Sequence, residues 1–262
     1  FFSRLSASRM QAIKYTRGSL ELLNQKLLPH QMVFEDASTV ELVYDAIKDM
    51  KVRGAPAIAI SALLGLAAEI HKLRPISAAS PPAGYADLDE AMATLFSKLD
   101  FLHGSRPTAV NLGNAISECK ARLTEAAKGS CPRIPEAVEA LLESCIAFAE
   151  DYFRADVRIN TAISQFGCDH ILANCRAPGA KVRLMTHCNT GALATTQYGT
   201  ALGVIRFVHT AEQLERVYCT ETRPYNQGAR LSAYECVTEG MPTTLLVDSA
   251  VSHLLRTQGV HA

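Results

Sequence analysis

The sequence has no excess of charge of either sign. Its 26 lysines and arginines balance 26 aspartates and glutamates over 262 residues. A chain that gathers nucleic acid or anionic lipid through its overall field needs such an excess. We therefore expect the partner to be a small molecule or a protein, and neither a nucleic acid nor a membrane.

Long hydrophobic runs and nucleotide-binding fingerprints are missing too. The longest apolar stretch, 55–68, is interrupted by Pro56 and Ser61 and falls short of the roughly 20 residues that span a bilayer. It predicts a buried helix instead. Neither G-x-G-x-x-G nor G-x-x-x-x-G-K-[ST] occurs, so we expect no dinucleotide or nucleoside triphosphate, and no cofactor.

The eight cysteines contain no C-x-x-C pair. Structural zinc sites usually draw on such pairs, and most of these cysteines lie within apolar patterns. We therefore expect a reduced, intracellular protein that holds no metal. The first nine residues, FFSRLSASR, contain two arginines and no acid. They resemble the tail of a transit peptide, but we favour an extension ahead of Met10.

Helical periodicity dominates residues 10–177, which we interpret as a mainly helical N-terminal domain. Ser38 and Glu41 have the spacing of a capping box and predict a helix over Thr39–Lys51. Pro107 suits the first turn of another helix. Further helices are expected after Pro56 and near 88–99, 134–153 and 158–174, with a surface loop at 74–84.

From residue 178 onward, short β-rich runs alternate with helical patterns. The runs are KVRLMTH, ERVYCTE and TTLLVDS, and helices are expected near 194–209, 228–239 and 249–257. This order predicts a parallel, doubly wound sheet. Residues 259–262 have the character of a fourth strand's beginning, so we expect 178–262 to form an incomplete Rossmann-like domain. The predicted fold class is α/β.

Polar loops follow the three predicted strands, at 186–192, 220–228 and 248–249. Ligands of open parallel sheets bind beyond the carboxyl ends of the strands. Cys188 precedes a glycine-containing turn into a helix, whose N–H groups would lower the pKa of its thiol. The alternative is a buried, inert cysteine. For His187 we favour a structural role over a Cys-His pair.

Several groups could bind an anion. Arg223 and Gln227 offer charge and amide donors within the second loop. Arg53-Gly54-Ala55-Pro56 and Arg106-Pro107-Thr108 each place an arginine ahead of a predicted helix, which suits a phosphate. The alternative for Arg223 and Gln227 is a surface arginine and a glutamine at a helix N-terminus. For the other two segments, the alternative is that arginine beside proline is common at helix starts. Together these groups fit a phosphate held between the two domains.

Four segments resemble the methylthioribose-1-phosphate isomerase family. They are MKVRGAPAIAI at 50–60, RPTAVN at 106–111, THCNTGALAT at 186–195 and TETRPYNQGARL at 220–231. The resemblance runs from about Met10 to the last residue. It implies isomerisation of 5-methylthioribose 1-phosphate to 5-methylthioribulose 1-phosphate in methionine salvage. It also implies a homodimer when the chain is full length, located in the cytoplasm and also in the nucleus.

The resemblance assigns roles to six residues. Cys188 matches the family's catalytic cysteine. The positions that match substrate-binding residues are Arg53, Gly54, Ala55, Arg106 and Gln227. The family's general acid is an aspartate in a Gly-Ala-Asp-Arg segment that this sequence does not contain. We therefore expect little or no activity from these 262 residues, and we expect Asp248 to cap the helix beginning near Ala250.

Two other functions fit the same resemblance. The regulatory alpha, beta and delta subunits of translation initiation factor 2B use this fold for assembly. Ribose-1,5-bisphosphate isomerase shares the cysteine motif but accommodates a second phosphate. The cysteine of THCNTG and the complete second loop favour an enzyme, because a scaffold has no chemical need for a thiol beside anion donors.

Overall fold

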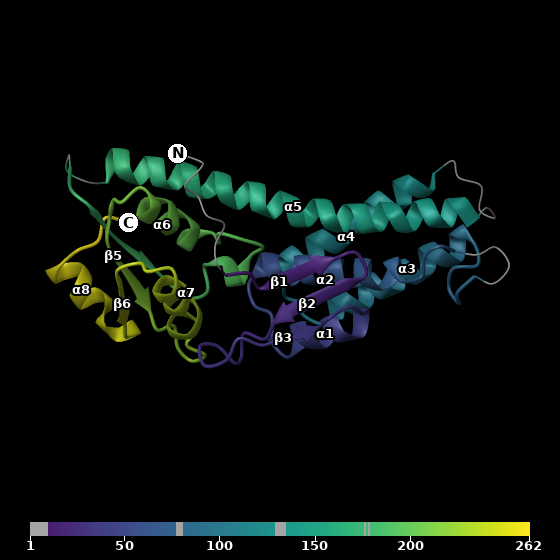
Figure 1. Cartoon of the computed structure of the whole chain (residues 1–262), viewed down its shortest axis with the longest axis horizontal. Coiled ribbons are helices and arrows are strands. Elements are labelled where there is room, and N and C mark those ends of the chain that lie inside the picture. The colour runs from purple at the N-terminus through teal and green to yellow at the C-terminus, as the bar shows by residue number, and fades with distance from the viewer. Residues whose placement is uncertain (1–9, 77–80, 129–134, 176, 178) are drawn as a thin grey trace. The chain divides into compact units, whose positions relative to one another are not determined.

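The computed structural model describes residues 10–76, 81–128, 135–175, 177 and 179–262. Residues 1–9, and residues 77–80 of the predicted loop, lie outside this range. Contacts divide the chain into a helical unit, 13–24 and 33–154, and a sheet unit, 10–12, 25–32 and 155–262 (Figure 1). The sequence instead predicts a boundary at 177/178, and that boundary stays a prediction.

The helical unit contains a small antiparallel sheet that the sequence did not reveal. Its strands are β1 (Ile13–Thr16), β2 (Ser19–Leu23) and β3 (Phe34–Asp36), in that order. Leu20 and Leu22 of β2 are buried, and Glu21 between them is exposed. This alternation is that of a strand with one covered face.

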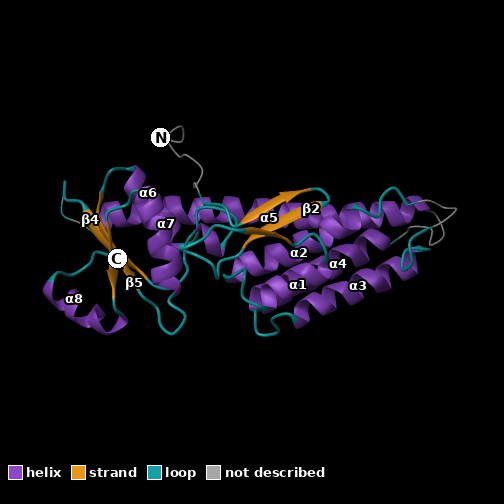
Figure 2. Ribbon diagram, turned by 60° about the horizontal axis from the view of Figure 1, so that its bottom comes forward, coloured by secondary structure: helices purple, strands orange, loops and turns teal. Residues whose placement is uncertain are grey.

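Helix α2 (Ala55–His71) forms the core of the helical unit. It contacts α1 (Val40–Lys48) and α4 (Val110–Ala127), and α3 (Leu88–Gly104) contacts α4 (Figure 2). Thirteen residues of α2 are buried, which confirms the prediction of a buried helix. Among the described residues, no helix is long and apolar enough to cross a membrane.

The helix predicted over Thr39–Lys51 is confirmed as α1, but its predicted cap is wrong, and so is the predicted beginning of the next helix at Pro107. The cap of α1 is Thr39, whose Oγ1 accepts the N–H of Leu42 at 3.2 Å. The Ser38 hydroxyl accepts the N–H of Leu20 instead, at 2.8 Å. Helix α4 begins at Val110 rather than at Pro107, because the preceding backbone closes a turn in which the N–H of Ala109 donates to Arg106.

Helix α5 (Pro135–Asn174) is continuous over 40 residues. The sequence predicted two helices, near 134–153 and 158–174. The residues between them contain neither glycine nor proline, so nothing in the chain interrupts the helix. Residues 135–154 belong to the helical unit, and the remainder belongs to the sheet unit.

The sheet unit confirms the predicted α/β fold. Its strands β4 (Val182–Thr186), β5 (Leu214–Thr220) and β6 (Thr243–Leu246) are parallel and adjacent in that order. Helices α6 (Ala201–Thr210) and α7 (Ala233–Thr238) connect them, and α8 (Val251–Thr257) follows β6. Helix α6 begins seven residues later than expected, after a 3-10 turn at Ala192–Ala194.

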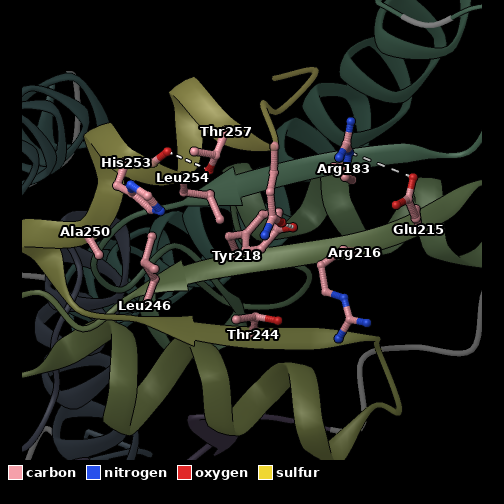
Figure 3. Close-up of a pocket in the computed structure, with 11 residues that line it drawn as sticks. Arg183, Glu215, Arg216, Tyr218, Thr244, Leu246, Ala250, His253, Leu254 and Thr257 are labelled. Carbon is pink, nitrogen blue, oxygen red and sulfur yellow. Dashed lines mark hydrogen bonds and ion pairs between the residues drawn. The ribbon is translucent and has the colours of Figure 1, made fainter.

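The two faces of this sheet differ. Val182 and Leu184 of β4 are buried in the core beside residues of α6 and α7. Arg183 and Tyr218 belong to the other face, where they line a cavity of about 590 Å³ together with residues of α8 (Figure 3). Helices therefore flank both faces, as in a doubly wound fold.

The order of the strands reverses at β4. The N–H of His261 donates to the carbonyl of Arg183 at 2.8 Å, and the N–H of Met185 donates to Ala262 at 2.9 Å. These bonds bring residues 261–262, which we expected to begin a fourth strand, alongside β4 on the edge away from β5. The carboxyl end of β4 therefore lies at a topological switch point.

Candidate active site

Cys188 lies two residues beyond β4, at this switch point. Its side chain is partly exposed, and its backbone adopts the left-handed conformation, with φ of +69°. Its N–H donates to Oγ1 of Thr222 at 2.9 Å, and its carbonyl accepts the Ser232 hydroxyl at 2.5 Å. Both neighbours follow β5, so two segments hold the backbone of this residue.

Thr222 is itself in the left-handed region, with φ of +59°. The two oxygens of the Asp248 carboxylate accept the N–H groups of Thr222 and Arg223, each at 2.9 Å. The Arg223 and Thr222 N–H groups lower the pKa of Asp248. The prediction that Asp248 caps the next helix is wrong, because α8 begins at Val251 without a side-chain cap.

His187 is hydrogen-bonded at the same carboxyl edge of the sheet. Its Nδ1 lies 2.6 Å from Oγ1 of Thr220, which lies 3.1 Å from Oγ1 of Thr222. This pairing fits the structural role that we favoured for the histidine. The ring therefore has a partner on the β5 loop, and nothing in the geometry pairs it with the thiol of Cys188.

Part of the turn after Cys188 is hydrogen-bonded to a buried carboxylate. The N–H groups of Ala192 and Leu193 donate to the buried carboxylate of Glu235, at 2.8 and 3.1 Å. The N–H of Cys188 is also committed, to Thr222. These three N–H groups therefore donate to partners other than the thiol.

Glu235 belongs to a buried ionic cluster. Arg206 contacts Glu235, donates to Glu239 at 2.6 Å, and donates to the carbonyl of Tyr198. Burial would lower the pKa of Arg206, but Glu235 and Glu239 raise it, so the guanidinium stays charged. A Cβ on Gly191 would lie 2.4 Å from both carboxylate oxygens of Glu235, so a side chain at residue 191 would displace this carboxylate.

Gln227 is buried immediately before a π-helical segment, Gly228–Ser232. A Cβ on Gly228 would lie 1.7 Å from the carbonyl oxygen of Thr220. Only glycine therefore lets this segment begin so close to the end of β5. That approach places Gln227 at the same edge of the sheet as the loop that contains Cys188.

Gln25, from the N-terminal part of the chain, also contacts the loops at this carboxyl edge of the sheet. Nε2 of Gln25 donates to the carbonyl of Leu193 at 2.7 Å, and Nδ2 of Asn189 donates to Oε1 of Gln25 at 3.3 Å. Nη1 of Arg230 donates to the carbonyl of Gln25 at 3.0 Å. Gln25 belongs to the sheet unit, although it follows a strand of the helical unit.

The other predicted binding residues belong to the helical unit. Arg53 precedes α2 as predicted, and Gly54 adopts φ of +106° at the first turn. Ala55 is exposed, and Nη1 of Arg53 lies 2.9 Å from the sulfur of Met50. Arg106 lies four residues before α4 rather than directly ahead of it, which weakens the helix-terminus argument for this residue.

Sequence reasoning missed four supporting side chains, those of Gln25, Thr222, Ser232 and Glu235. Thr222 alone could have been suspected, because it lies in a predicted loop at the carboxyl edge. Within the ranges described, no group of three or more histidine, cysteine, aspartate or glutamate side chains could hold a metal ion.

Comparisons with known proteins agree on one family. The model of the initiation factor 2 subunit family matches residues 51–262. The chain is 48% identical over 253 residues to the methylthioribose-1-phosphate isomerase of Nematostella vectensis, covering 97% of this chain and 67% of that relative. The isomerase of Naegleria gruberi is also 48% identical, over 97% of this chain and 64% of the relative. The chain thus spans about two thirds of these relatives.

Solved structures give the same result. The 5-methylthioribose 1-phosphate isomerase of Pyrococcus horikoshii aligns with a TM-score of 0.80 at 30% identity, over 97% of this chain and 64% of that one. The delta subunit of translation initiation factor eIF-2B from A. fulgidus aligns with a TM-score of 0.73 at 33% identity, over 96% and 66%. The chain therefore belongs to the initiation factor 2 subunit family and, within it, to the methylthioribose-1-phosphate isomerases.

Proposed function

We propose that the whole protein converts 5-methylthioribose 1-phosphate to 5-methylthioribulose 1-phosphate in methionine salvage. The observation that carries this proposal is the location of Cys188, directly beyond the strand at which the sheet order reverses. Open α/β sheets bind their ligands at such a point. The thiol is partly exposed while the backbone around it is fixed from two sides. The names of the relatives support the substrate.

The isomerisation requires a general acid and a group that abstracts or stabilises the hydrogen at C2. A phosphate on the anomeric oxygen prevents simple opening to an aldehyde, so a general acid must help to break the ring C–O bond. Cys188 then abstracts or stabilises the hydrogen that migrates from C2. The family's acid is an aspartate of a Gly-Ala-Asp-Arg segment, which no residue of this sequence matches.

Substrate binding is proposed for Arg53, Gly54, Ala55, Arg106 and Gln227. The beginning of α2 directly after Gly54 supports the first three, because a helix N-terminus favours an anion. Burial of Gln227 near the Cys188 loop supports an amide donor to a sugar hydroxyl. For Arg106 the support is the resemblance of its segment alone.

The test is Cys188→Ser in a chain completed with the part of the N. vectensis relative that the alignment does not cover. We expect kcat/KM to fall by roughly 10²- to 10⁴-fold, as for loss of a group that transfers hydrogen. Cys175→Ser, which changes another partly exposed cysteine, is the matched control and should retain full activity. An active Cys188→Ser enzyme would contradict the proposal.

Two further measurements refine it. Assays with 5-methylthioribose 1-phosphate and with ribose 1,5-bisphosphate distinguish the two sugar-phosphate isomerases. Deuterium at substrate C2 distinguishes the routes of hydrogen transfer, since complete exchange with solvent would exclude a direct hydride shift. We expect turnover of the methylthio sugar alone.

A second candidate function is supported by the likeness to an initiation factor subunit. In that case the chain would act through assembly, and no sugar phosphate would be turned over. Affinity purification of the tagged chain tests this alternative. Recovery of initiation factor subunits in stoichiometric amounts, together with no turnover of either sugar phosphate, would favour assembly over isomerase activity.

We also propose that the whole protein is a homodimer. Ile159, Ile163 and Phe166 form an exposed apolar stripe on α5, with the spacing of one helix face. Phe166→Glu should shift the sedimentation coefficient toward that of a monomer. Leu255→Glu, which changes an exposed residue on α8, is the control. An unchanged dimer in Phe166→Glu would exclude this stripe as the interface.

A further inference from the structure

We infer that Asp248 is a positioning residue for Cys188. Its carboxylate holds Thr222 in the left-handed conformation in which the Thr222 hydroxyl accepts the N–H of Cys188. The catalytic consequence rests on the proposed function, which makes Cys188 the reacting group. The positioning itself can be measured without substrate.

The first link joins Asp248 to the β5 loop. Its Oδ1 accepts the N–H of Thr222 and its Oδ2 accepts the N–H of Arg223, each at 2.9 Å. Two consecutive N–H groups that converge on one anion form a nest. Threonine is branched at Cβ, so its left-handed backbone, φ +59°, is strained. The carboxylate provides the interaction that holds this conformation.

The second link joins Thr222 to the β4 loop. Oγ1 of Thr222 accepts the N–H of Cys188 at 2.9 Å and lies 3.3 Å from the carbonyl of Thr220. Cys188 is also left-handed, with φ of +69°. Strain at two hydrogen-bonded residues is sustained only where the surrounding structure fixes both. One connection between the loops after β4, β5 and β6 therefore runs through the Thr222 hydroxyl and the Asp248 carboxylate.

The far side of the same β4 loop is anchored independently. Ala192 and Leu193 donate to Glu235, which lies on α7. Asp248 has no hydrogen bond to that anchor in the described residues. Removal of Asp248 should therefore release the N–H of Cys188 and leave the N–H groups of Ala192 and Leu193 as they are. A general loosening of the fold would release all of them.

Hydrogen exchange of backbone amides tests this directly. In Asp248→Ala, we expect the amides of Cys188, Thr222 and Arg223 to exchange at least about tenfold faster, because each loses its restraint. The amides bonded to Glu235 should exchange at the wild-type rate. Asp169→Ala, which removes an exposed aspartate on α5 of the same unit, is the matched control and should change none of these rates.

A second variant guards against misfolding of the first. Thr222→Val keeps the shape of the side chain but removes the acceptor, so the Cys188 amide should exchange faster while that of Arg223 remains protected by Asp248. If Asp248→Ala speeds exchange at Thr222 and Arg223 but not at Cys188, the link through the hydroxyl does not exist and the inference is wrong.

Kinetics separate this inference from the proposed function. In the completed enzyme, Asp248→Ala should lower kcat about 10²-fold through misplacement of the thiol, with KM nearly unchanged. An active Cys188→Ser enzyme would sink the proposed function but leave the exchange result intact. An inactive Cys188→Ser enzyme combined with full kcat in Asp248→Ala would sink the inference alone.

Discussion

The helical unit and the sheet unit each contain a cluster of arginine–glutamate pairs, and the two clusters differ in burial. The exposed cluster consists of Arg17, Arg74, Glu139, Glu143 and Glu150. Arg17 bonds Glu143 and Glu150 at 2.9 Å, and 41% of its side chain is exposed. The other side chains range from 14% exposed at Glu150 to 38% at Glu143, so water reaches this cluster more than it reaches a fully buried pair.

The buried cluster consists of Arg206, Glu235 and Glu239. Only 6% of the Arg206 side chain and none of the Glu235 side chain is exposed. Arg206 also donates to the carbonyl of Tyr198, and Glu235 accepts two backbone N–H groups of the turn that follows Cys188. Arginine–glutamate pairs of the helical unit therefore remain accessible to water. In the sheet unit, the buried Arg206–Glu235 pair fixes the backbone beside the candidate active site.

The largest effect of a single substitution is expected in the buried cluster. Glu235→Gln leaves Arg206 without its buried carboxylate and weakens both bonds to the turn. Breaking a buried ion pair by removing one partner costs about 3–5 kcal/mol, so the urea midpoint should fall strongly. Glu212→Gln, at an exposed position of the same unit, is the control. A loss below about 1 kcal/mol, the range of surface pairs, would abolish the contrast between the clusters.

Gly191→Ala should have the next largest effect, because its Cβ would lie 2.4 Å from the Glu235 oxygens. Forcing extra volume into a packed site costs about 1–3 kcal/mol. The cost should shrink when Glu235 is itself replaced by alanine, since the colliding atoms are then absent. A double-mutant cycle on the free energy of unfolding measures this coupling. Additive effects would show that residue 191 does not depend on the carboxylate.

The sequence predicted the parts of the fold that local periodicity encodes. Alternation and apolar runs identified the three parallel strands, and the longest apolar stretch, 55–68, identified α2. The strands of the antiparallel sheet, IKYT, SLELL and FED, do not lie in β-rich runs like those that identified the parallel strands. The continuity of α5 was missed because apolar spacing weakened around 154–157, although no residue there breaks a helix.

The candidate site was predictable only in outline. The polar loops after the strands predicted that Cys188 lies at the carboxyl edge of the sheet, as it does in the structure. The contacts that hold this residue depend on Asp248 and Glu235, each more than 40 positions away in the sequence. No local pattern shows that a carboxylate will stabilise a left-handed threonine, because that pairing exists only after the strands have assembled. Asp248 was consequently assigned to the wrong helix cap.

In the exposed cluster, Glu143→Gln should have a small effect. The carboxylate contacts Arg17 at 2.9 Å and also Arg74, but its side chain is 38% exposed. Surface pairs contribute about 0.2–1 kcal/mol, and salt screens them. Urea unfolding at low and at high salt should show a difference from the wild type that fades as salt rises. A large loss that persists at high salt would mean that this cluster behaves like the buried one.

The smallest expected effect is the pH dependence of the stability that the Glu139 carboxylate contributes. Burial alone would raise its pKa, but the N–H of Ile76 and the Arg74 guanidinium lower it below its ordinary value of 4.5. A carboxylate with a lowered pKa stabilises the fold fully above that ordinary value, and this contribution is lost as the pH falls through the lowered pKa. The stability difference between the wild type and Glu139→Gln should therefore stay constant near neutral pH and shrink below about 4.5. Urea midpoints from pH 7 down to about 3 measure it, and a difference that grows on acidification would contradict the assigned sign.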